Sequence, residues 1–151
     1  MIRVAAKAII IKENKILVIE NYKDQIYYTL PGGGQNHKED LHQTLKRECI
    51  EEIGVDVKVG ELEFVCEYIS GRHDDSIHSD NFHQIDMFFR CELFGNICVE
   101  NAAERDATQT GYKWLNIGEL NSSVFYPMKL REHIVRLHNG TKEVTYLGEG
   151  G

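Results

Sequence analysis

The chain has 151 residues, which is enough for one domain with a substantial core. Its 42% hydrophobic and 27% charged residues are typical of a soluble globular protein, and no apolar run approaches the roughly 20 residues of a membrane helix. The net charge of −7 argues against a nucleic-acid polymer as partner, because such proteins usually present a basic surface, but it permits a single nucleotide. The cysteines lack metal-ligand spacing and the N-terminus lacks a signal peptide, so we expect reduced thiols in a cytoplasmic protein.

The first part of the chain predicts short strands separated by turns. Hydrophobic residues alternate and then run together over residues 4–11, and a second apolar run covers residues 16–19, so we expect these strands to pair as a hairpin. The polar residues 21–25 predict a loop, and residues 26–30 predict a further strand. Residues 31–34, Pro-Gly-Gly-Gly, predict a turn whose backbone can approach a metal ion or a phosphate, because glycine has no side chain to block that approach.

A helix is predicted between Asp40 and Gly54. Asp40 is a good N-cap, Gln43 completes a capping-box-like pair with it, and Gly54 ends the helix. Apolar side chains recur within it at four-residue spacing, and this stripe should face the core: Leu41, Leu45, Cys49 and Ile53. The stripe fixes which side of the helix the remaining residues occupy.

Glu48, Glu51 and Glu52 lie near the end of this helix. At about 100° per residue they fall within one sector roughly 100° wide, and Glu48 and Glu52 border the apolar stripe. Clustered carboxylates repel one another unless a cation lies between them, and a hard divalent cation suits such ligands. A solvated acidic face is the commoner arrangement on helices, but it would require neither two acids beside the stripe nor a glycine-rich turn just upstream.

The second half of the chain predicts the remaining strands and a closing helix. The clearest alternation places Ile85, Met87 and Phe89 toward the core of a central strand, with Phe88 and Arg90 on its other face. The other expected elements are a strand over 62–68, polar loops over 73–80 and 101–110, a short strand over 112–115 and a helix over 128–137. We expect one domain over residues 1–146, followed by a disordered tail over 147–151.

Eight residues around the first helix have the spacing of a known motif: Gly33, Glu39, Arg47, Glu48, Glu51, Glu52, Gly54 and Val55. They match the fixed positions of the Nudix box, so the chain resembles the MutT-like Nudix hydrolases. Cys49 stands where an aliphatic residue is usual, a role that a small buried thiol can fill. The resemblance implies an α/β (α+β) fold, namely an α/β/α sandwich in which a mixed sheet lies between helices.

The resemblance also implies a pyrophosphatase reaction and roles for the matching residues. A metal-activated water would attack the diphosphate linkage of a nucleoside diphosphate joined to another group. Arg47 would pair with Glu39 and fix the loop against the helix, with Gly33, Gly34 and Gly54 as further structural positions. The ligands of Mg²⁺ or Mn²⁺ would be Glu48, Glu51, Glu52 and the backbone carbonyl of Gly33.

The general base is left open between the helix and a later loop. Glu51 is favoured narrowly, because a carboxylate on a rigid helix is already positioned beside a metal-held water. Glu100 and Glu104 are alternatives, since a loop that closes over substrate could bring either carboxylate to the water. Gln109 cannot usefully accept a proton, so it could only orient a neighbour.

Substrate contacts are predicted on weaker grounds. Cations that could bind phosphate are Arg3, Lys23 and Arg72, and aromatic residues that could stack on a nucleobase include Tyr28 and Phe82. His73, His78 and His83 stand five residues apart, which suits one face of neither a helix nor a strand. We therefore interpret them as exposed loop histidines beside the cleft and not as a zinc site.

Several functions remain compatible with the sequence. The substrate could resemble ADP-ribose or a nucleotide sugar, or it could be a nucleoside triphosphate, because the sequence markers that separate these classes in the resembled family are missing. A nucleotide-sensing module without catalysis and a prenyl-diphosphate isomerase of the same fold are the alternatives from other classes. The chain could act as a monomer or a homodimer on a small nucleotide, with no membrane partner.

Overall fold

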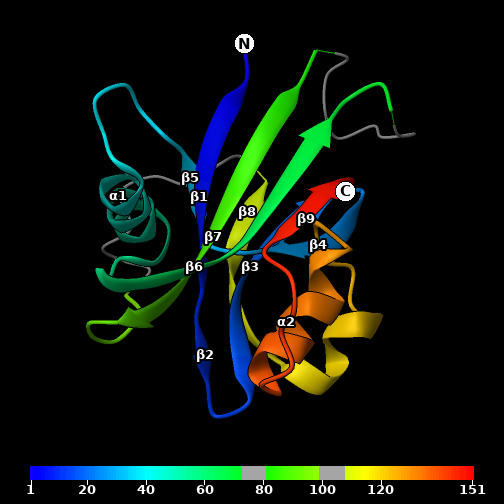
Figure 1. Ribbon diagram of the computed structural model, residues 1–151. Coiled ribbons are helices and arrows are strands. Elements are labelled where there is room, and N and C mark those ends of the chain that lie inside the picture. Colours follow the sequence, from blue (N-terminus) through cyan, green and yellow to red (C-terminus); the bar gives the residue numbers. More distant parts are fainter. Residues whose placement is uncertain (73–80, 99–107) are drawn as a thin grey trace.

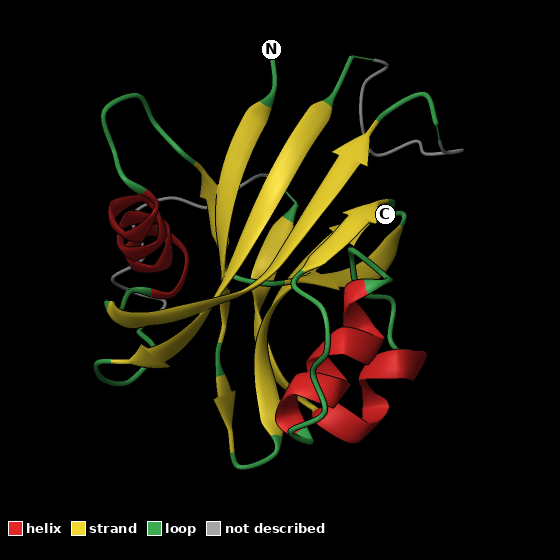
Figure 2. Cartoon of the chain, viewed as in Figure 1, coloured by secondary structure: helices red, strands yellow, loops and turns green. Residues whose placement is uncertain are grey.

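The computed structural model describes residues 1–72, 81–98 and 108–151. In this part of the chain, strands form a central layer, and the α-helices α1 and α2 lie on opposite sides of it (Figure 1, Figure 2). The helical elements are α1 (Leu41–Ile53), the 3-10 helix η2 (Ile117–Ser122) and α2 (Leu130–His138). The mixed α and β architecture predicted from the sequence is confirmed. No helix among the described residues is both long enough and apolar enough to cross a bilayer.

The larger sheet has five strands in the order β5-β1-β7-β6-β9. The sheet is mixed. The pairs β1–β7 and β6–β9 are parallel, whereas the pairs β1–β5 and β6–β7 are antiparallel. The predicted central strand is β7, which lies in the middle of this order. The strands are β1 (Arg3–Ile9), β5 (Gly32–Gly34), β6 (Val57–Ile69), β7 (His83–Leu93) and β9 (Tyr146–Glu149).

The second sheet is built on β3. Its strands are β2 (Ile11–Lys12), β3 (Lys15–Lys23), β4 (Gln25–Thr29) and β8 (Gln109–Asn116), and β3 pairs antiparallel with the other three. The expected first hairpin is present between β2 and β3, but β1 belongs to the larger sheet. The prediction of a loop over residues 21–25 is wrong. Strand β3 continues to Lys23, and β4 begins at Gln25 after a tight turn at Asp24, which has a positive φ of 65°. Polar residues there remain in strands because Asn21 is buried with its side-chain amide hydrogen-bonded.

Two hydrophobic clusters fill the two sides of the strand layer. One includes Leu45, Cys49 and Ile53 of α1, packed on apolar residues of both sheets. The other includes Leu130 and Ile134 of α2, packed on the opposite faces of the same sheets. The strand layer is therefore covered on both sides, which explains why residues 16–19 of β3 form a continuous apolar run.

This two-sided burial corrects the prediction for β7. Phe88, expected opposite the core, is only 1% exposed and lies in the α2 cluster, while Phe89 is 7% exposed in the α1 cluster. Ile85 and Met87 are half-buried instead of fully buried. At Phe88 and Phe89 the two faces of β7 thus contact different cores, although Arg90, on the same face as Phe88, is exposed.

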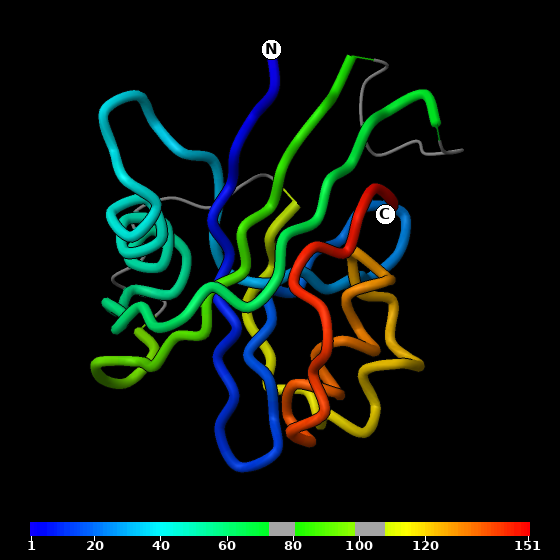
Figure 3. The backbone as a smooth tube through the Cα atoms, in the orientation of Figure 1, coloured from blue at the N-terminus to red at the C-terminus, as the bar shows by residue number. Residues whose placement is uncertain are grey.

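Two glycine-rich segments are more ordered than predicted. The expected turn at residues 31–34 contains β5, which pairs with β1 through Ala6 opposite Gly33. The expected disordered tail contains β9, which lies beside β6 in Figure 3 and pairs with it through Val65 opposite Tyr146. Lys129 also donates to the carbonyl oxygens of Leu147 and Gly148 at 3.1 and 2.6 Å. Long-range pairing has overridden the low strand propensity of glycine in both places.

Candidate active site

Helix α1 holds the acidic residues in a fixed register. The Asp40 carboxylate accepts from the Gln43 backbone N–H at 2.8 Å, and the Gln43 side chain accepts from the Asp40 backbone N–H at 2.9 Å, so the predicted capping box is present. Gly54 ends the helix in the left-handed conformation with φ of 68°. Between these ends Leu45, Cys49 and Ile53 are buried against the sheets, which places Glu48 and Glu52 at the edge of the helix–sheet interface.

Arg47 connects this helix to the loop before it. Its Nε donates to Glu39 Oε2 at 2.7 Å and its Nη2 donates to Glu39 Oε1 at 3.0 Å, a bidentate pair of the kind that fixes both side chains. Nη2 also donates to the Gly34 carbonyl at 3.0 Å. The hydrogen bonds from Arg47 hold the pKa of Glu39 down at about 2, so Glu39 is ionised throughout the neutral range.

The same guanidinium lies between two of the clustered acids. Nη1 of Arg47 is 3.0 Å from Glu48 Oε1 and 3.4 Å from Glu51 Oε2. Burial raises the pKa of the Glu48 carboxyl, and Arg47 opposes this shift. A cation is therefore already present where the sequence predicts that the carboxylates need one.

Glu52 points away from this pair, toward the sheets. Its Oε1 accepts from the Gly32 backbone N–H at 2.7 Å, and its Oε2 accepts from the Gln109 amide at 2.6 Å. The residue is only 8% exposed, and burial raises the pKa of Glu52 to about 7 although the Lys7 ammonium and both hydrogen bonds oppose the shift. Glu52 is thus a buried carboxyl that would gain from a further cation.

The glycines of β5 allow the acidic side chains to approach the sheet. A Cβ added at Gly33 would lie 2.5 Å from the Glu48 carboxyl carbon, so only glycine leaves room for Glu48 in this position. A Cβ at Gly34, on the other face of the strand, would lie 2.6 Å from Arg3 Nε. Gly32 has a φ of 136°, which L side chains rarely adopt. The strand therefore brings bare backbone against Glu48 on one face and Arg3 on the other.

These residues suit a divalent cation by their chemistry, although their side chains are not gathered around one point. Carboxylate and backbone carbonyl oxygens are the ligands that Mg²⁺ and Mn²⁺ prefer. In residues 1–72, 81–98 and 108–151, no three Asp, Glu, His or Cys side chains lie close enough together to hold a metal ion. Glu48 and Glu51 face Arg47 while Glu52 faces Gly32 and Gln109, so Glu48 would have to turn away from Arg47 to share a cation with Glu52.

The predicted substrate contacts are dispersed. Arg3 lies over Gly34, and its Nη1 donates to Gln84 at 2.6 Å, so it is the predicted cation nearest to the glycine strand. Lys23, at the end of β3, and Arg72, in the turn after β6, are both exposed. Tyr28 packs against the α2 cluster with the Lys113 ammonium 5.7 Å from its ring. Phe82 packs beside Tyr68 with ring centroids 6.2 Å apart.

Some predictions fall outside the described residues. These are the alternative bases Glu100 and Glu104, together with His73 and His78. His83 is described, and its Nε2 lies 3.0 Å from Glu67 Oε2, so this histidine has a carboxylate partner. Lys7 and Gln109, which both act on Glu52, could not be predicted from the sequence, because an alternating strand pattern does not reveal which distant acid a polar strand residue will face.

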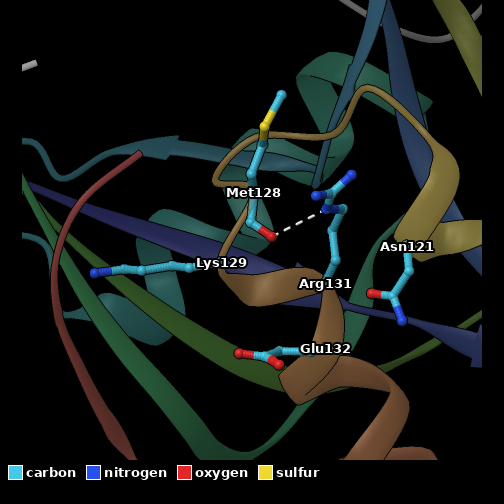
Figure 4. Close-up of a pocket in the computed structure, with 5 residues that line it drawn as sticks. All are labelled: Asn121, Met128, Lys129, Arg131 and Glu132. Atoms are coloured by element: carbon cyan, nitrogen blue, oxygen red, sulfur yellow. Dashed lines mark hydrogen bonds between the residues drawn. The ribbon is translucent and has the colours of Figure 1, made fainter.

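An open hollow of about 460 Å³ lies on the α2 side of the molecule, and Figure 4 shows the side chains that line it. Its cations are already paired with backbone oxygens: Arg131 donates to Met128 and Ser123, and Lys129 donates to Leu147 and Gly148. The hollow therefore offers no uncommitted charge to an anionic ligand, and the acidic residues of α1 are the better candidate site.

The chain is similar to one protein family and to several solved structures. Its sequence matches the NUDIX domain family over residues 1–135. No curated protein matches it.

A NUDIX hydrolase from Nitrosomonas europaea is 17% identical with a TM-score of 0.74, over 94% of this chain and 92% of that one. A UDP-X diphosphatase is 17% identical with a TM-score of 0.72, over 97% and 67% of the two chains. An ADP-ribose pyrophosphatase from Streptococcus suis is 17% identical with a TM-score of 0.63, over 97% of each. At these identities the likeness to solved structures is one of fold.

Proposed function

Because the chain belongs to the NUDIX domain family, we propose that it is a divalent-metal-dependent pyrophosphohydrolase acting on a nucleoside diphosphate joined to another group. The observation that carries this proposal is the packing of Glu48 and Glu52 against the glycine strand β5. This packing holds both carboxylates beside the backbone of β5, so that carboxylate and backbone oxygens from two segments are available to one cation.

In this proposal two glutamates bind the metal ion and Arg47 orients the segments that carry the ligands. Glu48 and Glu52 would hold Mg²⁺ or Mn²⁺, with the Gly33 carbonyl as a further oxygen ligand. A bound divalent cation would neutralise phosphate charge and lower the pKa of a bound water. Arg47 keeps the loop at Gly34 and Glu39 against α1, so the ligands from the two segments keep a fixed separation.

Glu51 is the proposed general base. Its side chain is 28% exposed and its contacts with Arg47 are long, at 3.4 Å, so its carboxylate has lone pairs available for a water proton. Its helical position at the open edge of the site agrees with that role, because the attacking water must reach it from solvent. Glu100 and Glu104 remain the alternative bases.

The proposed substrate class follows from charge and from the related folds. Two of the solved structures with this fold are named as an ADP-ribose pyrophosphatase and a UDP-X diphosphatase, which supports a nucleoside diphosphate linked to a second group. Arg3 lies over Gly34 on the other face of β5, which supports its proposed contact with a phosphate that extends past Gly34. The other predicted contacts are not needed for this proposal: Lys23, Tyr28, Arg72 and Phe82. A nucleoside triphosphate is the second candidate.

The test is hydrolysis of a nucleotide panel with Mg²⁺, with the products resolved. The panel should contain ADP-ribose, UDP-sugars, nucleoside triphosphates and a prenyl diphosphate, and it should be run on wild type, Glu48→Gln and Glu61→Gln. Glu61 is an exposed residue of β6, so it is a matched control for the loss of one carboxylate. We expect release of a nucleoside monophosphate from a diphosphate-linked substrate, abolished by Glu48→Gln and by chelation but not by Glu61→Gln. Equal rates in all three proteins, or rates unaffected by a chelator, would contradict the proposal.

A further inference from the structure

The hydrogen bond between Gln109 and Glu52 connects the acidic helix to the second sheet. It is short, at 2.6 Å, and it joins residues 57 positions apart in the sequence. Gln109 is the first residue of β8, and Glu52 belongs to the last turn of α1. Since the other oxygen of Glu52 accepts from Gly32, both oxygens of this carboxylate are oriented by neutral donors, one from each sheet.

Gln109 is itself held firmly by β3. It pairs with Asn21 at an irregularity in the β3–β8 register, where the pairing shifts between Glu20 and Asn21. Asn21 is 4% exposed, and its amide donates to Thr29 Oγ1 at 3.0 Å. The preceding residue, Thr108, accepts from the Tyr22 backbone N–H at 2.9 Å. The backbone of β3 therefore contacts the backbone both at Gln109 and at the residue before it.

A neutral amide suits the task of orienting a metal ligand. A carboxylate has about four lone-pair sites, so one donor on each oxygen of Glu52 leaves a lone pair on each for a cation. A lysine or arginine in the place of Gln109 would add a competing positive charge, whereas an amide adds none. Residues that donate to metal-binding side chains in this way commonly govern the metal affinity.

We propose that Gln109 is a positioning residue that aims the Glu52 carboxylate at the divalent cation, an inference that rests on the proposed function. In this role it acts through Glu52, to which its amide donates. Its predicted effect is on metal affinity, and the transfer of the proton from water belongs to another residue.

The test is Mn²⁺ binding to the full chain, measured by calorimetry without nucleotide, for wild type, Gln109→Met and Thr110→Ala. Methionine keeps the length of the side chain but cannot donate a hydrogen bond. Thr110 is a matched control, because it is an exposed residue of β8 whose hydroxyl donates to Glu20 of β3 and not to an acid of α1. We expect Gln109→Met to weaken Mn²⁺ binding by about 10- to 100-fold and Thr110→Ala to leave it unchanged.

Two further readouts separate positioning from a general structural role. The melting temperature of metal-free Gln109→Met should stay near that of wild type. Its kcat should recover at high Mg²⁺. The Mg²⁺ concentration for half-maximal rate should rise by the same factor as the Mn²⁺ dissociation constant. Gln109→Ala, which removes the amide by shortening the side chain, should give the same result. Mn²⁺ affinities equal to that of wild type in both variants would overturn the inference while leaving the proposed function intact. Failure of the wild-type protein to bind Mn²⁺ would instead overturn the proposed function.

Discussion

Replacing Gly33 by alanine tests whether the glycine strand controls the geometry of the acidic residues. The added Cβ would lie 2.5 Å from the Glu48 carboxyl carbon and 2.6 and 2.7 Å from its oxygens, whereas ordinary contact begins at 3.4 Å. The carboxylate must therefore withdraw by about 0.9 Å. Because the atom that must move is the end of a flexible side chain, we expect little loss of folding stability. A displacement of about 1 Å at a catalytic group can still cost about 100-fold in rate, so we expect a loss of that order in kcat.

The assay is the Mg²⁺-dependent release of nucleoside monophosphate, with the melting temperature measured in parallel. Gly118→Ala is the control, because Gly118 lies in η2 with nothing within 4 Å of an added Cβ. It should leave both the rate and the melting temperature unchanged. If Gly33→Ala retained wild-type kcat while remaining folded, the close approach of β5 to Glu48 would not be needed for catalysis, and the argument from this contact would fail.

Three further predictions concern the general base, the pH dependence of stability and the strand layer. Glu51→Gln should lower kcat by about 100-fold with a modest change in KM, and a pH–rate profile should show whether the basic limb is lost with it. Burial raises the pKa of Glu52 from 4.5 to about 7, so the folded metal-free protein holds this proton more tightly than the unfolded chain does. The resulting stability, of order 3 kcal/mol, should be present at low pH and be lost as the pH rises through about 7. Urea unfolding at pH 5 and pH 8 should show this loss in wild type and not in Glu52→Gln; equal losses in both would assign it to another group. Phe89→Ala should cost about 3–5 kcal/mol of unfolding free energy and Arg90→Ala less than about 0.5 kcal/mol, and similar denaturation midpoints would contradict the packing of β7.

The features that could be predicted from the sequence depend on residues close together in the chain. The capping box of Asp40 and Gln43 and the end of α1 at Gly54 are local, so the position of the acids on the helix was predicted correctly. The closing helix and the central place of β7 also followed from periodicity.

The features that were missed depend on contacts between distant segments. Gly32–Gly34 looks like a turn by propensity and becomes a strand only because β1 supplies partners. Burial of Phe88 could not be read from alternation, since Phe88 shares its face of β7 with polar residues such as Asp86 and Arg90 and is buried only by the α2 cluster. The orientation of Glu52 toward Gln109, and of Glu48 toward Arg47, depends on side-chain packing that spacing along a helix does not determine.

The short strand β9 also affects how the protein behaves in solution. An uncovered strand edge presents unpaired N–H and C=O groups that can recruit a strand from another molecule and so begin aggregation. Through Val65 and Glu67, β6 would present such an edge if β9 were absent. Tyr146 Oη reinforces the pairing by donating to Glu67 Oε1 at 2.8 Å. Shortening the chain before Tyr146 should thus leave α1 and its acids intact while making the protein prone to self-association through β6.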